Sequence, residues 1–116
     1  MNDTKYFDTS RCFVGSFYHR SILKAKQIDP TVKTIALIEG VPVSIKNIVH
    51  DSQCDYLGLG IESLDEQQIQ EARSEGCGVI VWTVDEADGL PLLCELGIDG
   101  VVSNFPDKIM KALSDT

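Results

Sequence analysis

The stretch Val79-Ile80-Val81-Trp82-Thr83-Val84 decides the fold class, because it is apolar almost without interruption. A strand with one face in water alternates apolar and polar side chains. Strands of a parallel sheet that is covered on both faces instead appear as continuous apolar runs. We therefore expect residues 79–84 to form a strand of a parallel sheet that is buried on both faces. Parallel neighbours need a crossover connection, which is usually a helix.

Helical segments flank this strand in the sequence. Ser63 and Glu66 have the spacing of a capping box, in which two side chains satisfy the free amides at a helix start, and Gly76 suits the end of that helix. Beyond the strand, Pro91 lacks an amide hydrogen, so a helix either begins there or is kinked there. Gly97 is a suitable end for this second helix.

The same unit of a strand followed by a helix repeats along the chain. Strand-like runs occupy residues 12–16, 34–38, 56–59, 79–84 and 101–102, and helix-like stretches follow at 18–28, 43–49, 63–75, 91–97 and 106–113. Such repeats predict an α/β fold with a parallel sheet and right-handed crossovers. A doubly wound sheet and a partial TIM (β/α)8 barrel both fit this pattern. The sequence contains neither a glycine-rich dinucleotide fingerprint after a strand nor a P-loop.

Length and composition limit the classes of protein. The chain has 116 residues, 43% of them hydrophobic, and a net charge of −8, which suits one folded domain and argues against disorder. A pI near 4.5 argues against nucleic acid or an anionic membrane as a partner. No apolar stretch is long enough to span a bilayer, and the polar start lacks the apolar core of a signal peptide. We therefore expect a cytoplasmic protein.

The four cysteines, Cys12, Cys54, Cys77 and Cys94, are far apart in the sequence. Zinc sites usually take two ligands from one short loop, and no such pair is present. We expect four reduced thiols and no metal site, with a disulfide as the alternative.

Three segments stand out by their order and spacing: Gly15-Ser16-Phe17-Tyr18-His19, Val81-Trp82-Thr83-Val84-Asp85 and Leu96-Gly97-Ile98-Asp99-Gly100-Val101-Val102-Ser103-Asn104-Phe105-Pro106. Together they resemble the C-terminal part of the glycerophosphodiester phosphodiesterase family. The resemblance divides the chain into an N-terminal extension, residues 1–10, and a barrel part, residues 11–116. That family folds as a TIM barrel, which takes about 250 residues. The resemblance therefore implies a partial barrel with about the last five strands.

The resemblance also implies a reaction. The family hydrolyses glycerophosphodiesters to an alcohol and glycerol 3-phosphate with a divalent metal, Mg²⁺ or Ca²⁺, and belongs to lipid and glycerol metabolism. Its catalytic and metal-binding motifs, including a His-Arg-Gly strand end, lie in the front part of the barrel. We therefore expect a truncated or fragmentary hydrolase with no catalytic residue, metal ligand or cofactor in this chain, inactive by itself. The alternative is a non-catalytic α/β module that binds a phosphate ester or a protein.

Four residues are predicted to contact substrate, because barrels carry functional groups at the carboxyl ends of their strands. Ser16 and Phe17 follow the first strand, Glu39 follows the second, and Trp82 lies in the strand of residues 79–84. The resemblance implies that Trp82 lines the mouth of the site, and a core tryptophan is the alternative. Glu39 also fits a polar residue that merely closes a strand.

Two histidine motifs superficially match the family's catalytic motifs. His19-Arg20 is followed by Ser21 where the family has glycine, and no Glu-x-Asp precedes His50-Asp51. We interpret both histidines as surface or helix-end residues. The sequence departs from the family pattern at Asp85, where Asn is usual, and at Ser103-Asn104, where Thr-Asp is usual.

A partial barrel has two open sheet edges with unpaired backbone groups. We therefore expect the chain either to form a homo-oligomer or to pair with a missing N-terminal half.

Overall fold

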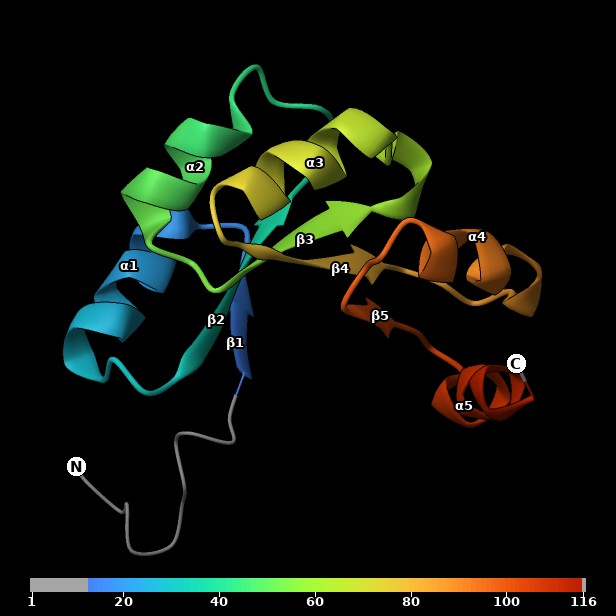
Figure 1. The fold of residues 1–116 in the computed structure, drawn as a ribbon. Helices are drawn as coiled ribbons and strands as arrows, with labels where there is room; N and C mark the ends of the chain where they lie inside the picture. The colour runs from blue at the N-terminus through green and yellow to red at the C-terminus, as the bar shows by residue number, and fades with distance from the viewer. Residues whose placement is uncertain (1–12, 116) are drawn as a thin grey trace, which may run out of the picture.

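The computed structural model describes residues 13–115, which form a five-stranded parallel sheet (Figure 1). The strands pair in their sequence order and are β1 (Phe13–Ser16), β2 (Lys33–Ile38), β3 (Tyr56–Gly60), β4 (Gly78–Trp82) and β5 (Gly100–Val102). A doubly wound sheet requires a point at which the strand order reverses. The consecutive order has no such point, so it excludes that alternative and confirms the partial (β/α)8 barrel. The predicted boundary after residue 10 lies outside the described residues.

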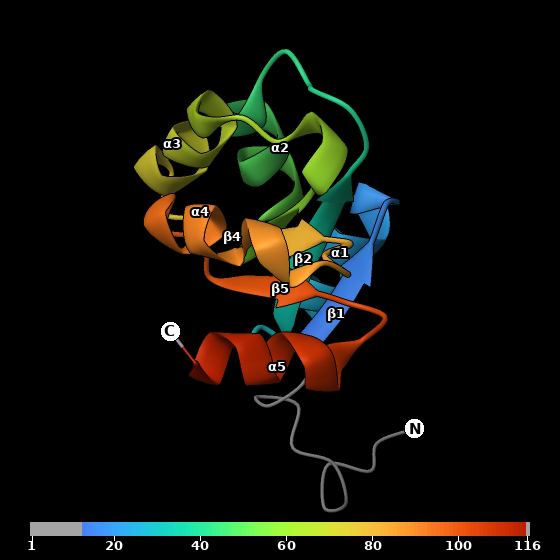
Figure 2. The same cartoon turned by 90° about the vertical axis from the view of Figure 1, so that its right-hand side faces the viewer.

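Each strand is followed by a helix, as predicted. The helices are α1 (His19–Ile28), α2 (Ile45–Ser52), α3 (Glu66–Ser74), α4 (Leu90–Glu95) and α5 (Pro106–Ser114), and two 3-10 turns are η2 (Ile61–Ser63) and η3 (Ala87–Gly89). Figures 1 and 2 show that α1, α2 and α3 lie together on one face of the sheet. Within residues 13–115, every helix is too short or too polar to cross a membrane.

The start of α3 differs from the prediction. The Asp65 carboxylate accepts from the Gln68 amide at 2.8 Å, and the Gln68 side chain accepts from the Asp65 amide at 3.1 Å. The capping box therefore uses Asp65 and Gln68, and the prediction of Ser63 and Glu66 was wrong. Starting the helix at Asp65 allows Leu64, the residue before the cap, to pack against the same core as Ile69 in the first turns. Ser63 instead ends the turn η2.

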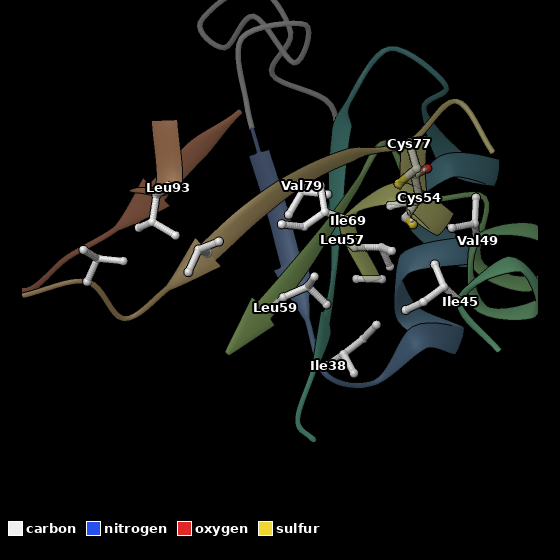
Figure 3. Packing of buried hydrophobic residues seen from close by; sticks show 14 of the residues in the cluster. Ile38, Ile45, Val49, Cys54, Leu57, Leu59, Ile69, Cys77, Val79 and Leu93 are labelled. Carbon is white, nitrogen blue, oxygen red and sulfur yellow. Dashed lines mark hydrogen bonds between the residues drawn. The ribbon is translucent and has the colours of Figure 1, made fainter. Parts of the chain in front are cut away.

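The hydrophobic core lies between the sheet and its covering helices (Figure 3). Alternate residues of the three central strands point into it, because side chains of a strand alternate between the two faces. The strand residues are Ala36, Ile38, Leu57, Leu59, Val79 and Val81, and the helices add Ile22, Ile45, Val49, Ile69 and Ala72, all of them buried.

The opposite face of the sheet is partly open. Ile80 and Trp82 in β4 are only half-buried, so the prediction that residues 79–84 are buried on both faces was wrong within residues 13–115. Phe13 at 58% and Val102 at 47% exposure line a hollow on this face together with Ile35. The reason is geometric: five strands form an arc rather than a closed barrel, so nothing in residues 13–115 lies opposite the inner face.

Candidate functional site

A cavity lies at the carboxyl ends of β2, β3 and β4. It has a volume of about 270 Å³ and is lined by Glu39, Gly40, Gly60, Ile61, Glu62, Ser63, Trp82 and Thr83. Parallel strands all end at the same edge of the sheet, so residues far apart in the sequence converge here. This is the edge at which TIM barrels carry their sites.

Trp82 forms one wall of the cavity and is held from two sides. Its indole Nε1 donates to the Gly58 carbonyl at 3.0 Å. The Phe17 ring lies edge-on to the indole, with 5.6 Å between the ring centroids and 89° between the planes. The indole is half-buried and its peptide bond to Thr83 is cis. The indole thus packs against Phe17 and also lines the cavity, and its role in binding substrate stays a prediction.

Three of the four predicted substrate-binding residues come together at this edge. Glu39 and Trp82 line the same cavity, and Phe17 contacts Trp82. Ser16 stabilises the turn from β1 into α1, because its Oγ accepts a hydrogen bond from the Tyr18 amide at 2.9 Å. A role in binding substrate stays a prediction for all four residues.

Sequence reasoning missed the contribution of the turn after β3. Glu62 and Ser63 line the cavity. Barrels carry functional groups at the carboxyl ends of their strands, and this rule applies to the end of β3 as it does to the ends of β1, β2 and β4. The polar residues after β3 could therefore have been predicted to line the site. Ser63 was instead interpreted as a helix cap because of its spacing from Glu66.

The two histidines have separate positions in the fold. His19 Nε2 lies 2.8 Å from the Leu37 carbonyl, which connects the start of α1 to β2. His50 Nε2 lies 2.9 Å from Glu75 Oε1, which connects the last turn of α2 to the end of α3. Both contacts agree with the interpretation of helix-end residues.

Two aspartates anchor the amino ends of the strands, opposite the cavity. The Asp99 carboxylate accepts from the Val79 amide at 2.8 Å and lies 3.5 Å from the Arg73 guanidinium. Asp55 repeats this arrangement between β2 and β3, accepting from the Thr34 amide at 2.8 Å. The segment Leu96-Gly97-Ile98-Asp99-Gly100 therefore aligns β5 with β4, and Gly97 adopts the positive φ of 76° that ends the preceding helix.

The family model described as "Glycerophosphoryl diester phosphodiesterase family" matches residues 1–108. The chain belongs to this family. Among curated phosphodiesterases, it is similar to the glycerophosphodiester phosphodiesterase of Bacillus subtilis, with 24% identity over 111 residues that cover 92% of this chain and 38% of the relative. The chain thus spans well under half the length of that glycerophosphodiester phosphodiesterase.

Solved structures of phosphodiesterases show the same fold. A phosphodiesterase of Oleispira antarctica aligns with a TM-score of 0.79 at 22% identity, covering 88% of this chain and 41% of that one. A glycerophosphodiester phosphodiesterase of Parabacteroides distasonis aligns with a TM-score of 0.78 at 18% identity, covering 97% of this chain and 47% of that one. At these identities the likeness supports the fold, and here too the chain covers less than half of each relative.

The glycerophosphodiester phosphodiesterase family is generally metal-dependent, and residues 13–115 do not form a metal site by themselves. Within residues 13–115, no three His, Cys, Asp or Glu side chains gather closely enough to hold an ion. The cavity has two carboxylates, Glu39 and Glu62. Calcium takes about six to eight oxygen ligands, whereas magnesium keeps several waters and binds through one or two carboxylates together with substrate phosphates. Residues 13–115 therefore show no complete ligand set for the family's metal.

The departures from the family pattern contact one another. Asn104 donates to Asp85 through its backbone amide at 2.8 Å and its side chain at 3.1 Å, and the Ser103 hydroxyl lies 3.2 Å from Asp85. These hydrogen bonds, with the Asn104 amide first, hold the pKa of Asp85 below its ordinary value. The phosphodiesterase pattern has Asn at the first position and Asp at the second. This chain has the two residue types exchanged, and here they form a carboxylate–amide pair between the ends of β4 and β5.

Proposed function

We propose that this chain forms the substrate-binding side of a glycerophosphodiester phosphodiesterase site and binds the alcohol portion of a glycerophosphodiester between Glu39 and Trp82. The observation that carries this proposal is the convergence of Phe17, Glu39 and Trp82 from three strands at the carboxyl edge of a barrel of this family. The phosphodiesterase of Oleispira antarctica was solved in complex with its product sn-glycerol-3-phosphate, which supports this substrate class.

The chemistry of the cavity favours one end of such a substrate. Among residues 13–115, its lining has two carboxylates, one indole and no Lys, Arg or His side chain. Carboxylates accept hydrogen bonds from hydroxyls and attract a cationic head group, and an indole face also attracts an ammonium group. The same carboxylates repel a phosphate. The cavity therefore suits the hydroxyl-bearing or ammonium-bearing portion of the diester, and groups outside the cavity must hold the phosphate.

Hydrolysis is proposed to require the complete family barrel. A divalent metal, Mg²⁺ or Ca²⁺, would polarise the phosphoryl group in that barrel. Since residues 13–115 gather no set of metal ligands, the contribution proposed for this chain is to bind and orient the alcohol portion. The chain alone is proposed to be inactive.

The test uses glycerophosphocholine and the emission of Trp82, the single tryptophan of the chain. Adding the diester is expected to shift this emission. Glu39→Gln is expected to raise the Kd about tenfold, since hydrogen bonds to charged groups contribute about 1.5 kcal/mol or more. Glu95→Gln, an exposed carboxylate on α4, is the matched control and should leave the Kd unchanged. An emission that does not respond to millimolar diester contradicts the proposal.

The same samples test catalysis. With Mg²⁺ or Ca²⁺ added, the chain alone should release no glycerol 3-phosphate above background. Metal-dependent turnover that disappears in His19→Ala or His50→Ala would show that these histidines act catalytically and that the chain is active by itself.

We also propose that the open barrel is completed by association, either with a second copy or with an N-terminal half. The half-exposed inner face carries Phe13, Ile35, Tyr56, Ile80 and Val102 around one hollow. Fully burying an apolar side chain of this size stabilises by about 1.5–3 kcal/mol, so covering several is a large gain beside a typical stability of about 5–15 kcal/mol. A two-fold dimer is the commonest arrangement.

Light scattering during size-exclusion chromatography should therefore give at least twice the chain mass of 12.8 kDa. Ile80→Asp, which places a charge on the inner face, should shift the protein toward the monomer. Val43→Asp, at a fully exposed position, is the control and should leave the mass unchanged. A monomer that unfolds cooperatively at micromolar concentration would contradict self-association.

A further inference from the structure

A pair of buried thiols lies at the amino ends of the central strands. Cys54 stands just before β3 and Cys77 just before β4, and the two are 8% and 4% exposed. Their Sγ atoms are 3.8 Å apart, which is direct contact. Figure 3 shows the two side chains together at one end of the core. The prediction of reduced thiols holds for Cys54, Cys77 and Cys94, while Cys12 lies outside the described residues.

The surroundings make the two thiols chemically unequal. The hydrogen bond from Cys77 lowers the pKa of Cys54 to about 7, outweighing the opposing effect of burial, and the Ser52 hydroxyl adds to the lowering. The hydrogen bond with Cys54 and burial raise the pKa of Cys77. A free cysteine has a pKa of about 8.5, and the thiolate is the reactive form. At neutral pH, Cys54 therefore has a larger thiolate fraction than a free cysteine, while Cys77 keeps its proton.

One thiol of the pair, Cys77, lines a surface hollow, and Cys54 is in direct contact with Cys77. Cys77 lines a hollow of about 430 Å³ at the amino ends of the strands, together with Lys33, Asp55, Arg73 and Asp99. This hollow lies at the edge of the sheet opposite the cavity that contains Glu39 and Trp82. A reaction at the thiol pair is therefore separate from the proposed substrate site.

We propose that Cys54 and Cys77 are a redox-sensitive modification site, which a hydroperoxide converts into a reversible intramolecular disulfide. The two sulfurs come from the approaches to different strands and touch with no atom between them.

The reaction has two steps. The Cys54 thiolate attacks one oxygen of hydrogen peroxide, the O–O bond breaks, and the departing hydroxide takes a proton to become water, which leaves a sulfenic acid on Cys54. Cys77 then loses its proton and attacks the Cys54 sulfur, so the S–O bond breaks and a second water leaves. Two thiols and one peroxide thus give one disulfide and two waters, with the sulfurs oxidised and the peroxide oxygens reduced. A thiol reductant restores both cysteines by exchange.

The experiment treats the folded full chain with hydrogen peroxide and then measures the intact mass and the linked peptides. The expected result is a loss of two hydrogen atoms, a dominant link between Cys54 and Cys77, and complete reversal by dithiothreitol. A Cys12→Ser, Cys94→Ser double variant should behave in the same way. The proposal is overturned if the folded double variant shows no such link, or if the links of the natural chain involve only Cys12 or Cys94.

Single substitutions test the order of the steps. Cys77→Ser should accumulate a sulfenic acid on Cys54 that dimedone traps, whereas Cys54→Ser should trap little dimedone at Cys77. Trapping at Cys77 instead would overturn the assignment of Cys54 as the attacking thiolate. If either single variant fails to fold, peptide mapping of the double variant still decides whether the disulfide forms.

Discussion

Leu57→Ala is expected to lower the free energy of unfolding by about 2–5 kcal/mol, the range observed when a buried leucine is truncated in a core. Leu57 is completely buried in β3, the middle strand of the sheet. The register places it beside Ala36 of β2 and Val79 of β4, which are also completely buried. Neighbours on both sides are held in a paired sheet, so they cannot easily move to fill the space. Urea denaturation followed by circular dichroism measures the change.

The matched control for this substitution is Leu92→Ala on α4. Leu92 is 60% exposed, so removing its side chain should change stability by about 0.5 kcal/mol or less. If Leu57→Ala costs no more than Leu92→Ala, the interface between the sheet and helices α1 to α3 is not the core of the protein.

Asp55→Ala is expected to lower the free energy of unfolding by about 2–4 kcal/mol, because it removes charged hydrogen bonds and leaves a partly buried cation. The Asp55 carboxylate lies 2.8 Å from the Lys26 ammonium, with side chains 25% and 15% exposed. It also accepts from the amide of Thr34, a completely buried residue. Without Asp55, Lys26 would retain the Pro30 and Val32 carbonyls but no carboxylate.

The control for Asp55→Ala is Asp88→Ala in the exposed turn η3, which should change stability by about 0.5 kcal/mol or less. Equal effects of the two substitutions would show that the contacts of Asp55 contribute nothing specific.

The lowered pKa of Asp55 predicts that the free energy of unfolding falls at acidic pH. Burial raises the pKa of Asp55, but the hydrogen bonds from Lys26 and Thr34 outweigh burial, so the pKa lies below its ordinary value of 3.8. The carboxylate form is thus favoured by folding. Its stabilisation is fully present above the unfolded pKa of about 3.9 and is lost as the pH falls through the folded pKa.

The comparison uses the urea midpoint of the natural chain and of Asp55→Asn between pH 7 and pH 2. The natural chain should lose more stability below about pH 4 than the variant, because the variant has no carboxylate to protonate at this position. Parallel curves for the two proteins would show that Asp55 does not contribute to acid unfolding. Asp85, whose pKa is also lowered, is present in both proteins and cancels in the difference.

The sequence alone determined the elements that depend on neighbouring residues. Apolar runs marked the strands, and Gly76 and Gly97 marked two helix ends, where each adopts a positive φ. Pro106 marked the start of α5. These residues predict helix ends from the sequence alone, because proline lacks an amide hydrogen and glycine lacks a Cβ. Both properties determine the local backbone conformation independently of distant residues. The repeating strand–helix unit and the family motifs could be recognised because they also consist of residues that are close in the sequence.

Only the tertiary structure decided which distant residues meet. The sequence predicted a capping box at Ser63 and Glu66, but the folded chain uses Asp65 and Gln68, with Leu64 packed against the core. The contact of Phe17 with Trp82 and that of Cys54 with Cys77 join residues 65 and 23 positions apart. Such contacts depend on the order and register of strands, which no local pattern contains. The open inner face has the same origin, because apolar side chains of a strand are the same in a closed barrel and in an arc, and only the number of paired strands determines whether they are covered.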